Sequence, residues 1–546
     1  MVDVRGRAEV VTGADSSLRW DVTAAGLVAG ALTILVIVIG PPGPDVPAHL
    51  FQRGFLLAHG PTLWNNLWYA GQYDSVTYSL IYYPLAAVVG VAALAVGSIS
   101  AAATMFTLAM RRLLGRAGRL SAASFALVWP GVALTGALPF ALGMAFAFAA
   151  LVALQRGRLG WVTALCVLCL AASPLAFLFL AVVLLWLLAV HRSDWRRYRG
   201  PIFVVAAAAV AEAVLWRLFP SEGRYPFWAS DFVCSCAAAI IGAAYCWRAS
   251  HLRLLRSLFV AYGVLCVTLF LVPSEIGANI ARVRLLALPL ALAGLAARRW
   301  RPLWISIAIL IAGATWNGLA LVTAFSRSAG DTSGHAQYWA PSVGWLKSHL
   351  TLDYRVEAVD TSGHWPAAFL PDAGIPLARG WFRQADFPVN DVLYHPLTPA
   401  GYVTWLRSLG VEYVVLSDAP PDFSSAREAR LLRSGTSGLS LVARTGAVTI
   451  YAVPEPTPIV TGPGHASITE FATGGLSVAL DKPGVYRVAV RWSPYWRTTN
   501  GCLAPSGDGM TTLTMNALGT ADIDLAVTPA SALNTAAGIR PECAAP

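Results

Sequence analysis

Apolar runs separated by short polar segments make up the first three fifths of the chain. They recur from Ala24 to Val322, and most approach the roughly 20 residues with which a helix crosses a bilayer. We predict about eleven membrane-spanning helices here. The run at 80–110 is long enough for two helices, but one tilted or bent span fits the charge pattern described below. The predicted spans are 24–40, 80–110, 120–135, 138–154, 161–173, 175–190, 201–219, 232–247, 257–272, 285–297 and 303–323.

The chain after Phe325 has a different pattern. It is polar, rich in Gly, Pro, Ser and Thr, and has no run long enough to cross a bilayer. Residues 354–359 and 411–416 have the composition of strands, and 398–409 has the pattern of a helix. From Leu439 onward, short β runs such as 449–453 and 485–490 alternate with Gly and Pro turns. We therefore expect an α/β domain over 326–455 and a β-sandwich domain over 456–546.

Composition and charge indicate the class of protein and its orientation. Of 546 residues, 56% are hydrophobic and 12% charged, against roughly 25% charged in soluble domains. The net charge of +10 comes from Lys and Arg grouped between apolar runs, as in cytoplasmic loops, which disfavours nucleic acid binding. With a cytoplasmic N-terminus at 1–23, an odd number of spans places the C-terminal domains outside the cytoplasm. The chain is predicted to be a multi-pass plasma-membrane protein with a transmembrane domain over 24–325. The basic groups lie at 111–119, 156–158, 191–199, 248–256 and 298–301.

Cysteine positions agree with this division. Six of the eight cysteines fall within or beside apolar runs, where a free thiol usually acts as a small buried hydrophobe. Only Cys502 and Cys543 lie in the C-terminal region. Because two thiols in an oxidising compartment can pair, we predict a disulfide between Cys502 and Cys543. Cys166 and Cys169 have the spacing of half a metal site, but no second Cys or His pair accompanies them, so no metal ligand is assigned.

The predicted first outer loop, residues 41–79, holds the densest group of reactive and aromatic side chains in the membrane half. Asp45 and His49, four residues apart, share one face of a helix that starts after Pro44 or Pro47. A carboxylate and an imidazole where a helix leaves the bilayer can meet both a lipid-borne substrate and water. Asp45 would equally suit the N-cap of this helix, so the catalytic and capping interpretations both stay open.

The same loop carries a resemblance to a known family. Asp45-x-Pro-x-His49 is followed by Gly60-Pro61, by Trp64-Asn65, and by Gly71 and Tyr82-Tyr83-Pro84-Leu85. This order resembles the first outer loop of GT-C superfamily membrane glycosyltransferases, which use polyprenyl-phosphate sugars as donors. The resemblance implies that Asp45 is the catalytic base. Many members have a second acidic residue beside the first, whereas this chain has Val46 there, and its next loop acid is Asp74.

Transfer from a lipid-phosphate donor also needs cations for the phosphate. We expect His49 to position Asp45 or to tune its basicity. We expect Arg282 and Arg284 to bind the donor phosphate, because a guanidinium donates two parallel hydrogen bonds to an oxyanion. Arg224 is a weaker candidate for the same role. The alternative for Arg282 and Arg284 is snorkelling to lipid headgroups or pairing with Glu275.

Aromatic and basic side chains suited to sugars recur in the C-terminal region. The acceptor candidates are Trp64 and Asp74 in the first outer loop and His364, Trp365, Arg379, Trp381 and Arg383 in the α/β domain. Ordinary domain packing is the alternative for the second group.

We therefore expect a membrane glycosyltransferase that moves a sugar from a polyprenyl-phosphate donor to an envelope glycan or lipid acceptor. A non-enzymatic envelope protein that binds lipid-linked glycans is the competing hypothesis, and a transporter or flippase is a third. No cofactor is assigned, although a divalent cation, Mg²⁺ or Mn²⁺, stays open. Ala, Val and Arg usage fits a high-GC bacterium such as an actinomycete.

Overall fold

The computed structural model describes residues 16–74, 78–190, 195–220, 223–247, 252–539 and Cys543. Most of the predicted cytoplasmic N-terminus, 1–23, lies outside these residues. The chain divides into two compact units. The helical unit comprises Met1–Gly43, Ser79–Ala211 and Arg224–Ser326, and the C-terminal unit comprises Pro44–Tyr78, Glu212–Gly223 and Arg327–Pro546.

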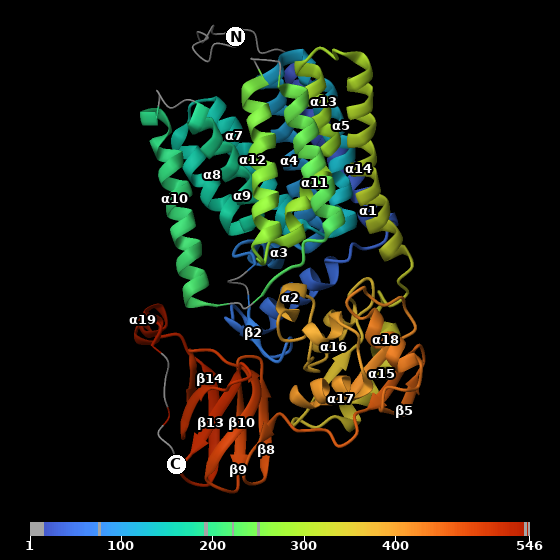
Figure 1. Ribbon diagram of the computed structural model, residues 1–546, viewed down its shortest axis with the longest axis vertical. Helices are drawn as coiled ribbons and strands as arrows, with labels where there is room; N and C mark the ends of the chain where they lie inside the picture. Colours follow the sequence, from blue (N-terminus) through green and yellow to red (C-terminus); the bar gives the residue numbers. More distant parts are fainter. Residues whose placement is uncertain are drawn as a thin grey trace. The chain divides into compact units, whose positions relative to one another are not determined.

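The helical unit is a bundle whose long helices run side by side (Figure 1). Its core is made of small and aromatic side chains, with Phe106 and Trp129 packing on Phe125. Small residues let membrane helices approach closely, which suits this core. The helices are α1 (Ser16–Ile39), α3 (Tyr82–Val89), α4 (Val91–Leu114), α5 (Arg119–Val128), α6 (Val132–Thr135), α7 (Leu138–Gln155), α8 (Leu159–Ala172), α9 (Pro174–Val190), α10 (Trp195–Leu218), α11 (Ala229–Cys246), α12 (Arg253–Leu271), α13 (Ala287–Ala297) and α14 (Leu303–Ala329).

Helices occupy each predicted span, but the predicted count of about eleven crossings is not confirmed. In the described part of the chain, six helical segments are long and apolar enough to cross a membrane, and three further apolar helices are shorter. The run at 80–110 breaks at Gly90, whose φ of 87° favours glycine, so the short α3 precedes the long α4. The segment 277–286 before α13 is a 3₁₀ helix.

The C-terminal unit contains a four-stranded mixed sheet with the order β3-β4-β6-β5. Strand β3 (Arg355–Ala358) runs parallel to β4 (Val411–Ser417), while β6 (Val448–Ala452) is antiparallel to both β4 and β5 (Ser440–Thr445). The helices of this part are α15 (Ala336–His349), α16 (Pro366–Asp372), α17 (Pro399–Ser408) and α18 (Ala426–Arg433). The strands expected near 354, 411 and 449 and the helix expected at 398–409 are confirmed.

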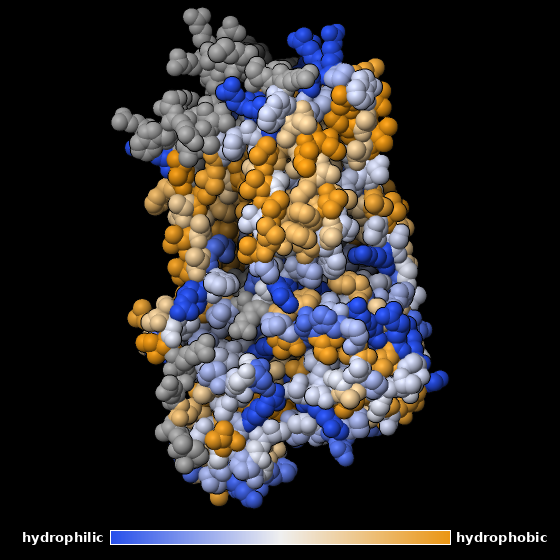
Figure 2. Space-filling view, in the orientation of Figure 1, coloured by the Kyte–Doolittle hydropathy of each residue, from blue (hydrophilic) through white to orange (hydrophobic). Residues whose placement is uncertain are grey.

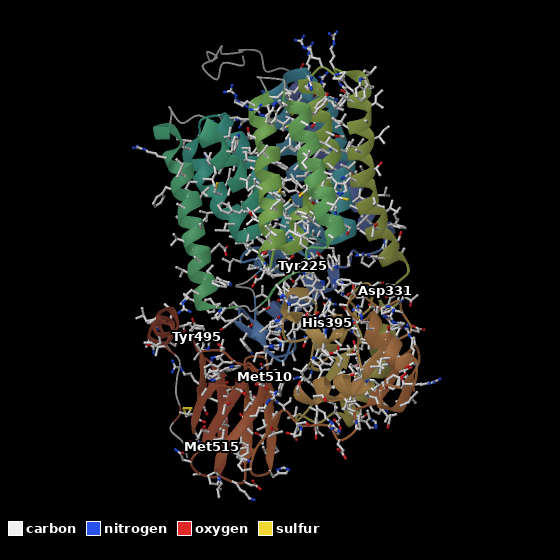
Figure 3. The ribbon with its side chains drawn as sticks, in the orientation of Figure 1. Tyr225, Asp331, His395, Tyr495, Met510 and Met515 are labelled. Atoms are coloured by element: carbon white, nitrogen blue, oxygen red, sulfur yellow. A yellow bond between two sulfur atoms is a disulfide. The ribbon has the colours of Figure 1, made fainter. Side chains whose placement is uncertain are left out.

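Two further four-stranded sheets follow and enclose one apolar core. Their orders are β12-β13-β10-β7 and β11-β14-β9-β8. Cys502 in β12 forms a disulfide with Cys543, drawn as a yellow bond in Figure 3. The bounds are β7 (Val460–Thr461), β8 (Ala466–Ala472), β9 (Gly475–Leu480), β10 (Gly484–Arg491), β11 (Trp496–Thr498), β12 (Cys502–Pro505), β13 (Met510–Met515), β14 (Gly519–Leu525) and the final helix α19 (Pro529–Ala537).

Two segments from the first half of the chain belong to the C-terminal unit. Residues Pro44–Tyr78 form α2 (Val46–His59) and the small hairpin β1 (Trp64–Asn65) and β2 (Gln72–Tyr73). Phe51 and Phe55 of α2 are buried in one core with Leu370 of α16. Residues Glu212–Gly223, which include the end of α10, form the second segment. Helix α2, which follows Asp45, therefore packs against α16, which lies some 300 residues further along the chain.

Candidate functional site

Asp45 lies at the N-cap of α2, as the proline spacing predicted. Its side chain makes no capping hydrogen bond to the helix, and the backbone N–H of His49 donates to the Asp45 carbonyl at 3.4 Å. The carboxylate is half-buried. Asp45 therefore occupies the capping position without a side-chain hydrogen bond to the helix backbone.

Aromatic side chains surround the first turn of α2. His49 is fully buried, and the rings of Tyr78 and Trp381 each lie 6.4 Å from it, centroid to centroid. The Trp381 indole N–H donates to the Pro44 carbonyl at 3.3 Å. Tyr78 also packs against Phe382 at 5.3 Å. The structure thus brings Trp381, a predicted acceptor residue, to the turn that carries Asp45 and His49.

A second Asp–His pair with the same spacing lies in the α/β part of this unit. His364 has a left-handed backbone with φ of 60°, and its Nδ1 contacts the carboxylate of Asp360. Arg383 forms an ion pair with Asp360. Its guanidinium also lies 3.0 Å from His364 Nδ1 and 3.5 Å from a carboxylate oxygen of Asp422. All four side chains are buried. Burial raises the pKa of Asp422, but His364 and Arg383 outweigh it, so the net pKa falls below its usual range.

Arg379 is the centre of a larger buried cluster. Its guanidinium donates to both carboxylate oxygens of Asp386, at 3.0 and 2.8 Å, and lies 3.8 Å from Glu357 and 3.9 Å from Glu428. Burial, and then Glu428, raise the pKa of Glu357 well above its usual range. Burial raises the pKa of Glu428 too, against the opposing effect of Arg379. One arginine among three buried carboxylates therefore favours a protonated glutamate.

One group of three residues in the described part of the chain has the donors and spacing of a metal site. Asp360, His364 and Asp422 place ligand atoms within 4.8 Å of one another. Oxygen and imidazole donors suit a divalent cation. Arg383, however, lies among the same atoms and supplies the positive charge itself. The group does not include Asp45, so we derive no catalytic step through a cation.

The other predicted acceptor residues of this unit are mostly buried. Trp64 donates its indole N–H to Asn66 at 2.7 Å and packs edge-on against Trp496 at 5.1 Å, inside the β-sandwich core. Asp74 is buried, and its backbone N–H donates to the Leu63 carbonyl at 3.0 Å. Trp365 is buried and stacks on Phe369 at 5.4 Å. For these three residues the acceptor role stays a prediction.

The predicted phosphate-binding arginines lie in the helical unit. Arg282 and Arg284 are on the 3₁₀ segment 277–286, where Arg282 lies over the Phe140 ring at 5.7 Å and Arg284 pairs with Asp231 at 3.4 Å. The exposed Arg224 adjoins Tyr225, which is labelled in Figure 3 and whose N–H donates to the Ser274 carbonyl at 2.9 Å. These contacts bring the Arg224 segment beside the one that leads to Arg282.

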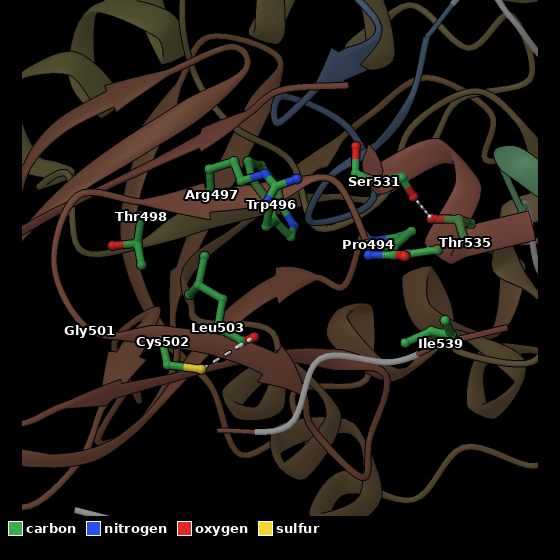
Figure 4. A pocket seen from close by; sticks show the side chains of 11 residues that line it. Pro494, Trp496, Arg497, Thr498, Gly501, Cys502, Leu503, Ser531, Thr535 and Ile539 are labelled. Atoms are coloured by element: carbon green, nitrogen blue, oxygen red, sulfur yellow. Dashed lines mark hydrogen bonds between the residues drawn. The ribbon is translucent and has the colours of Figure 1, made fainter. Parts of the chain in front are cut away.

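A separate pocket lies in the β-sandwich beside α19 (Figure 4). Its volume is 320 Å³, and it is lined by strand residues that include Trp496 and Arg497 and by Ser531 and Thr535 of α19. Trp496 is buried and donates its indole N–H to the Arg491 carbonyl at 2.9 Å. The buried Trp496 ring therefore forms part of the pocket wall.

Sequence reasoning missed the acids that hold the two arginines. Asp360, Asp386, Asp422, Glu357 and Glu428 come from separate segments of the α/β part. A partial signal existed, since Asp360 precedes His364 by the same four residues that separate Asp45 from His49. The sequence carried no such signal for the two glutamates. Glu357 lies within a strand and Glu428 within a charged helix, where an acidic residue does not stand out.

Comparison with known proteins finds similarity in structure alone. No family model matches the chain, and no curated protein matches it. A solved structure of the arabinofuranosyltransferase AftD from Mycobacteria aligns with 87% of this chain and 42% of its own, at 21% identity and a TM-score of 0.50. A structure of a mutant of AftD from Mycobacteria aligns with 94% of this chain and 60% of its own, at 16% identity and a TM-score of 0.48.

The first of these alignments shows which fold the chain has. The chain spans less than two thirds of the length of either solved protein. At 21% identity this alignment shows that the chain and AftD share a fold, and the wider resemblance to the GT-C superfamily stays a prediction. The apolar helices make the chain a multi-pass membrane protein.

Proposed function

We propose that this protein is a membrane glycosyltransferase that moves a sugar from a polyprenyl-phosphate donor to an envelope glycan or lipid acceptor outside the cytoplasm. The observation that carries the proposal is the fold likeness to AftD over 87% of the chain. The placement of Asp45 in the first turn of α2, which Trp381 contacts through the Pro44 carbonyl, supports it further.

In the proposed reaction Asp45 is the general base. Its carboxylate takes the proton of the acceptor hydroxyl as that oxygen forms the new bond to the anomeric carbon of the donor sugar. The bond from that carbon to the phosphate oxygen breaks, and the polyprenyl phosphate leaves with the electron pair. Attack from the face opposite the phosphate inverts the anomeric carbon. His49 is a positioning residue, since it is buried in the turn that carries the base.

The remaining proposed roles are binding of the donor phosphate by arginines and binding of the acceptor by an aromatic side chain. Arg282, Arg284 and Arg224 are proposed to bind the donor phosphate, because a guanidinium matches a phosphate oxyanion in shape and charge. Trp381 is the best supported acceptor residue, since its indole already holds the Pro44 carbonyl beside Asp45. We propose that the C-terminal unit lies outside the cytoplasm, where envelope acceptors lie, because the basic segments favour the cytoplasmic side.

The test compares Asp45→Asn with a second half-buried acid of the same unit. Asp391→Asn is the matched control, because Asp391 pairs with the exposed His395 at 2.9 Å, and partly exposed pairs contribute little to stability. Purified full-length protein is assayed with a panel of polyprenyl-phosphate sugars that includes arabinofuranose. We expect Asp45→Asn to lower turnover by roughly 10²- to 10⁴-fold and the control to stay near wild type.

Two outcomes would change the proposal. If wild type transfers sugar and Asp45→Asn transfers it equally well, Asp45 is not the base although the activity stands. If wild type binds the donors and transfers none of them, the lipid-linked glycan binder becomes the better hypothesis. Running the assay with Mg²⁺, with Mn²⁺ and with a chelator tests the divalent cation that the sequence left open.

A further inference from the structure

Helix α19 exposes its one large apolar side chain, Leu533, and buries the small polar Ser531 and Thr535. Leu533 is 70% exposed, and Ile539, just after the helix, is 58% exposed. The buried residues of the helix are Ser531 and Thr535. A helix that packs on a domain in water shows the opposite pattern. Figure 2 shows hydrophobic side chains gathered at the edge of the molecule where Figure 1 places α19.

The helix is formed and held by its own sequence. Thr528 and Ser531 form a reciprocal capping box at its start, and Pro529 is the first helical residue. Gly538 ends it in the left-handed conformation with φ of 74°. The Cys502–Cys543 disulfide then ties the chain after α19 back to β12. The exposed leucine therefore sits on a fixed helix.

The surface beside α19 is the end of α10. A Cβ on Gly538 would lie 2.8 Å from the guanidinium of Arg217. Tyr495, labelled in Figure 3, donates its hydroxyl to the Leu218 carbonyl at 2.8 Å. Helix α10 is apolar from Ile202 to Leu215 apart from Glu212, and Trp216, which follows, is 66% exposed. Trp and Arg at the end of an apolar helix are typical of the membrane–water interface.

We propose that α19 is an interfacial membrane helix that inserts Leu533 and Ile539 into the bilayer beside the end of α10. Trp216, which is also exposed, precedes Arg217, the residue that Gly538 approaches. The charges fit an anionic lipid surface, because the sequence has no acidic residue from Leu525 to Ile539 while Arg217 and Arg497 are exposed nearby. This inference is independent of the proposed transferase activity, since it concerns how the β-sandwich meets the lipid.

The test measures the lipid contact of one side chain directly. Leu533→Cys is labelled with an environment-sensitive fluorophore in full-length protein in nanodiscs of phosphatidylcholine and phosphatidylglycerol. Cys234→Ala and Cys236→Ala remove the more accessible of the free thiols, and the background without Leu533→Cys measures residual labelling. Leu518→Cys is the matched control, because Leu518 is also 70% exposed and lies in the turn between β13 and β14 of the same sandwich.

We expect shallow spin-labelled lipids to quench the label at 533 roughly twofold or more, since interfacial helices lie about 5–10 Å into the headgroup region. The label at 518 should respond to aqueous iodide and not to the lipid quencher. Replacing phosphatidylglycerol with phosphatidylcholine should weaken quenching at 533. The double variant Arg217→Gln and Arg497→Gln should weaken it as well. Equal behaviour of the two positions would overturn the proposal. So would a label at 533 that is shielded only when two copies share a nanodisc, which would mean that a second copy covers α19.

Discussion

Asp45 and Asp360 each precede a histidine by four residues, but the structure surrounds the two pairs differently. Asp45 begins a helix, is half-buried, and has aromatic rings around its histidine. Asp360 is buried beside Arg383, and the same arginine reaches Asp422. A carboxylate with a guanidinium against it is a poor base, because the positive charge stabilises its ionised form. The four-residue spacing alone therefore says little about chemistry, because the same spacing occurs in two different surroundings.

The largest expected effect is a loss of stability when the buried acids lose the arginine that they share. Arg379→Gln leaves Asp386, Glu357 and Glu428 without the cation that they share. Breaking a buried ion pair from one side costs about 3–5 kcal/mol, so the melting temperature should fall by roughly 10 °C. Thermal unfolding of the full-length protein in detergent, followed by tryptophan fluorescence, measures it.

The control for this change is Arg407→Gln. Arg407 is half-buried and donates to the Pro454 carbonyl and to the exposed Glu455. Its loss should cost less than about 1 kcal/mol. Equal melting temperatures for the two variants would mean that the Arg379 cluster does not hold the unit together.

A second prediction separates the two aspartates themselves. Asp360→Asn should lower stability by about 1.5–3 kcal/mol, the typical value of a hydrogen bond to a charged group, because Arg383 loses one of its two carboxylates. Asp45→Asn should lower transfer far more than Asp360→Asn does, because Asp45 is the proposed base. The same melting and transfer assays, applied to both variants, give the two readouts. If Asp360→Asn lowered transfer without lowering stability, the roles assigned to the two pairs would be reversed.

A third prediction uses pH. A raised pKa in the folded state means that stability is fully present below the unfolded pKa of about 4.3 and is lost as pH rises through the folded value. Glu357 is such a group. Glu357→Gln, which keeps the shape of the protonated acid, should therefore stabilise the protein by about 1 kcal/mol at pH 8 and have little effect near pH 4. Melting curves across this range check the sign, and a constant difference would contradict it.

Local pattern was enough to predict most of the elements. The apolar run at 138–154 became α7, which ends beside Arg156, and 411–416 became β4 within one residue. The first outer loop also suggested a resemblance to membrane glycosyltransferases, and the chain shares its fold with the arabinofuranosyltransferase AftD. These features depend on residues that are close in sequence, so hydrophobic periodicity and punctuation by Gly, Pro and Arg suffice to find them.

Contacts between distant residues were beyond the sequence. Trp64 seemed suited to a sugar, yet it fills the β-sandwich core against Trp496, which follows it by more than 400 residues. Arg379 seemed equally available, but four buried side chains from other segments hold it. Tertiary packing decides whether a tryptophan or an arginine faces a ligand or a core, and one sequence does not record that choice.

The smallest expected effect tests whether the aromatic turn positions Asp45. Trp381→Phe keeps a ring beside His49 and Tyr78 but removes the indole N–H that donates to the Pro44 carbonyl. One hydrogen bond is worth about 1 kcal/mol, so turnover should fall about fivefold, with kcat affected more than KM if the bond fixes the base. Trp345→Phe is the control, because Trp345 stacks on His349 at a different place in the unit. A loss confined to KM would instead make Trp381 an acceptor contact, and equal loss in both variants would make the effect one of packing.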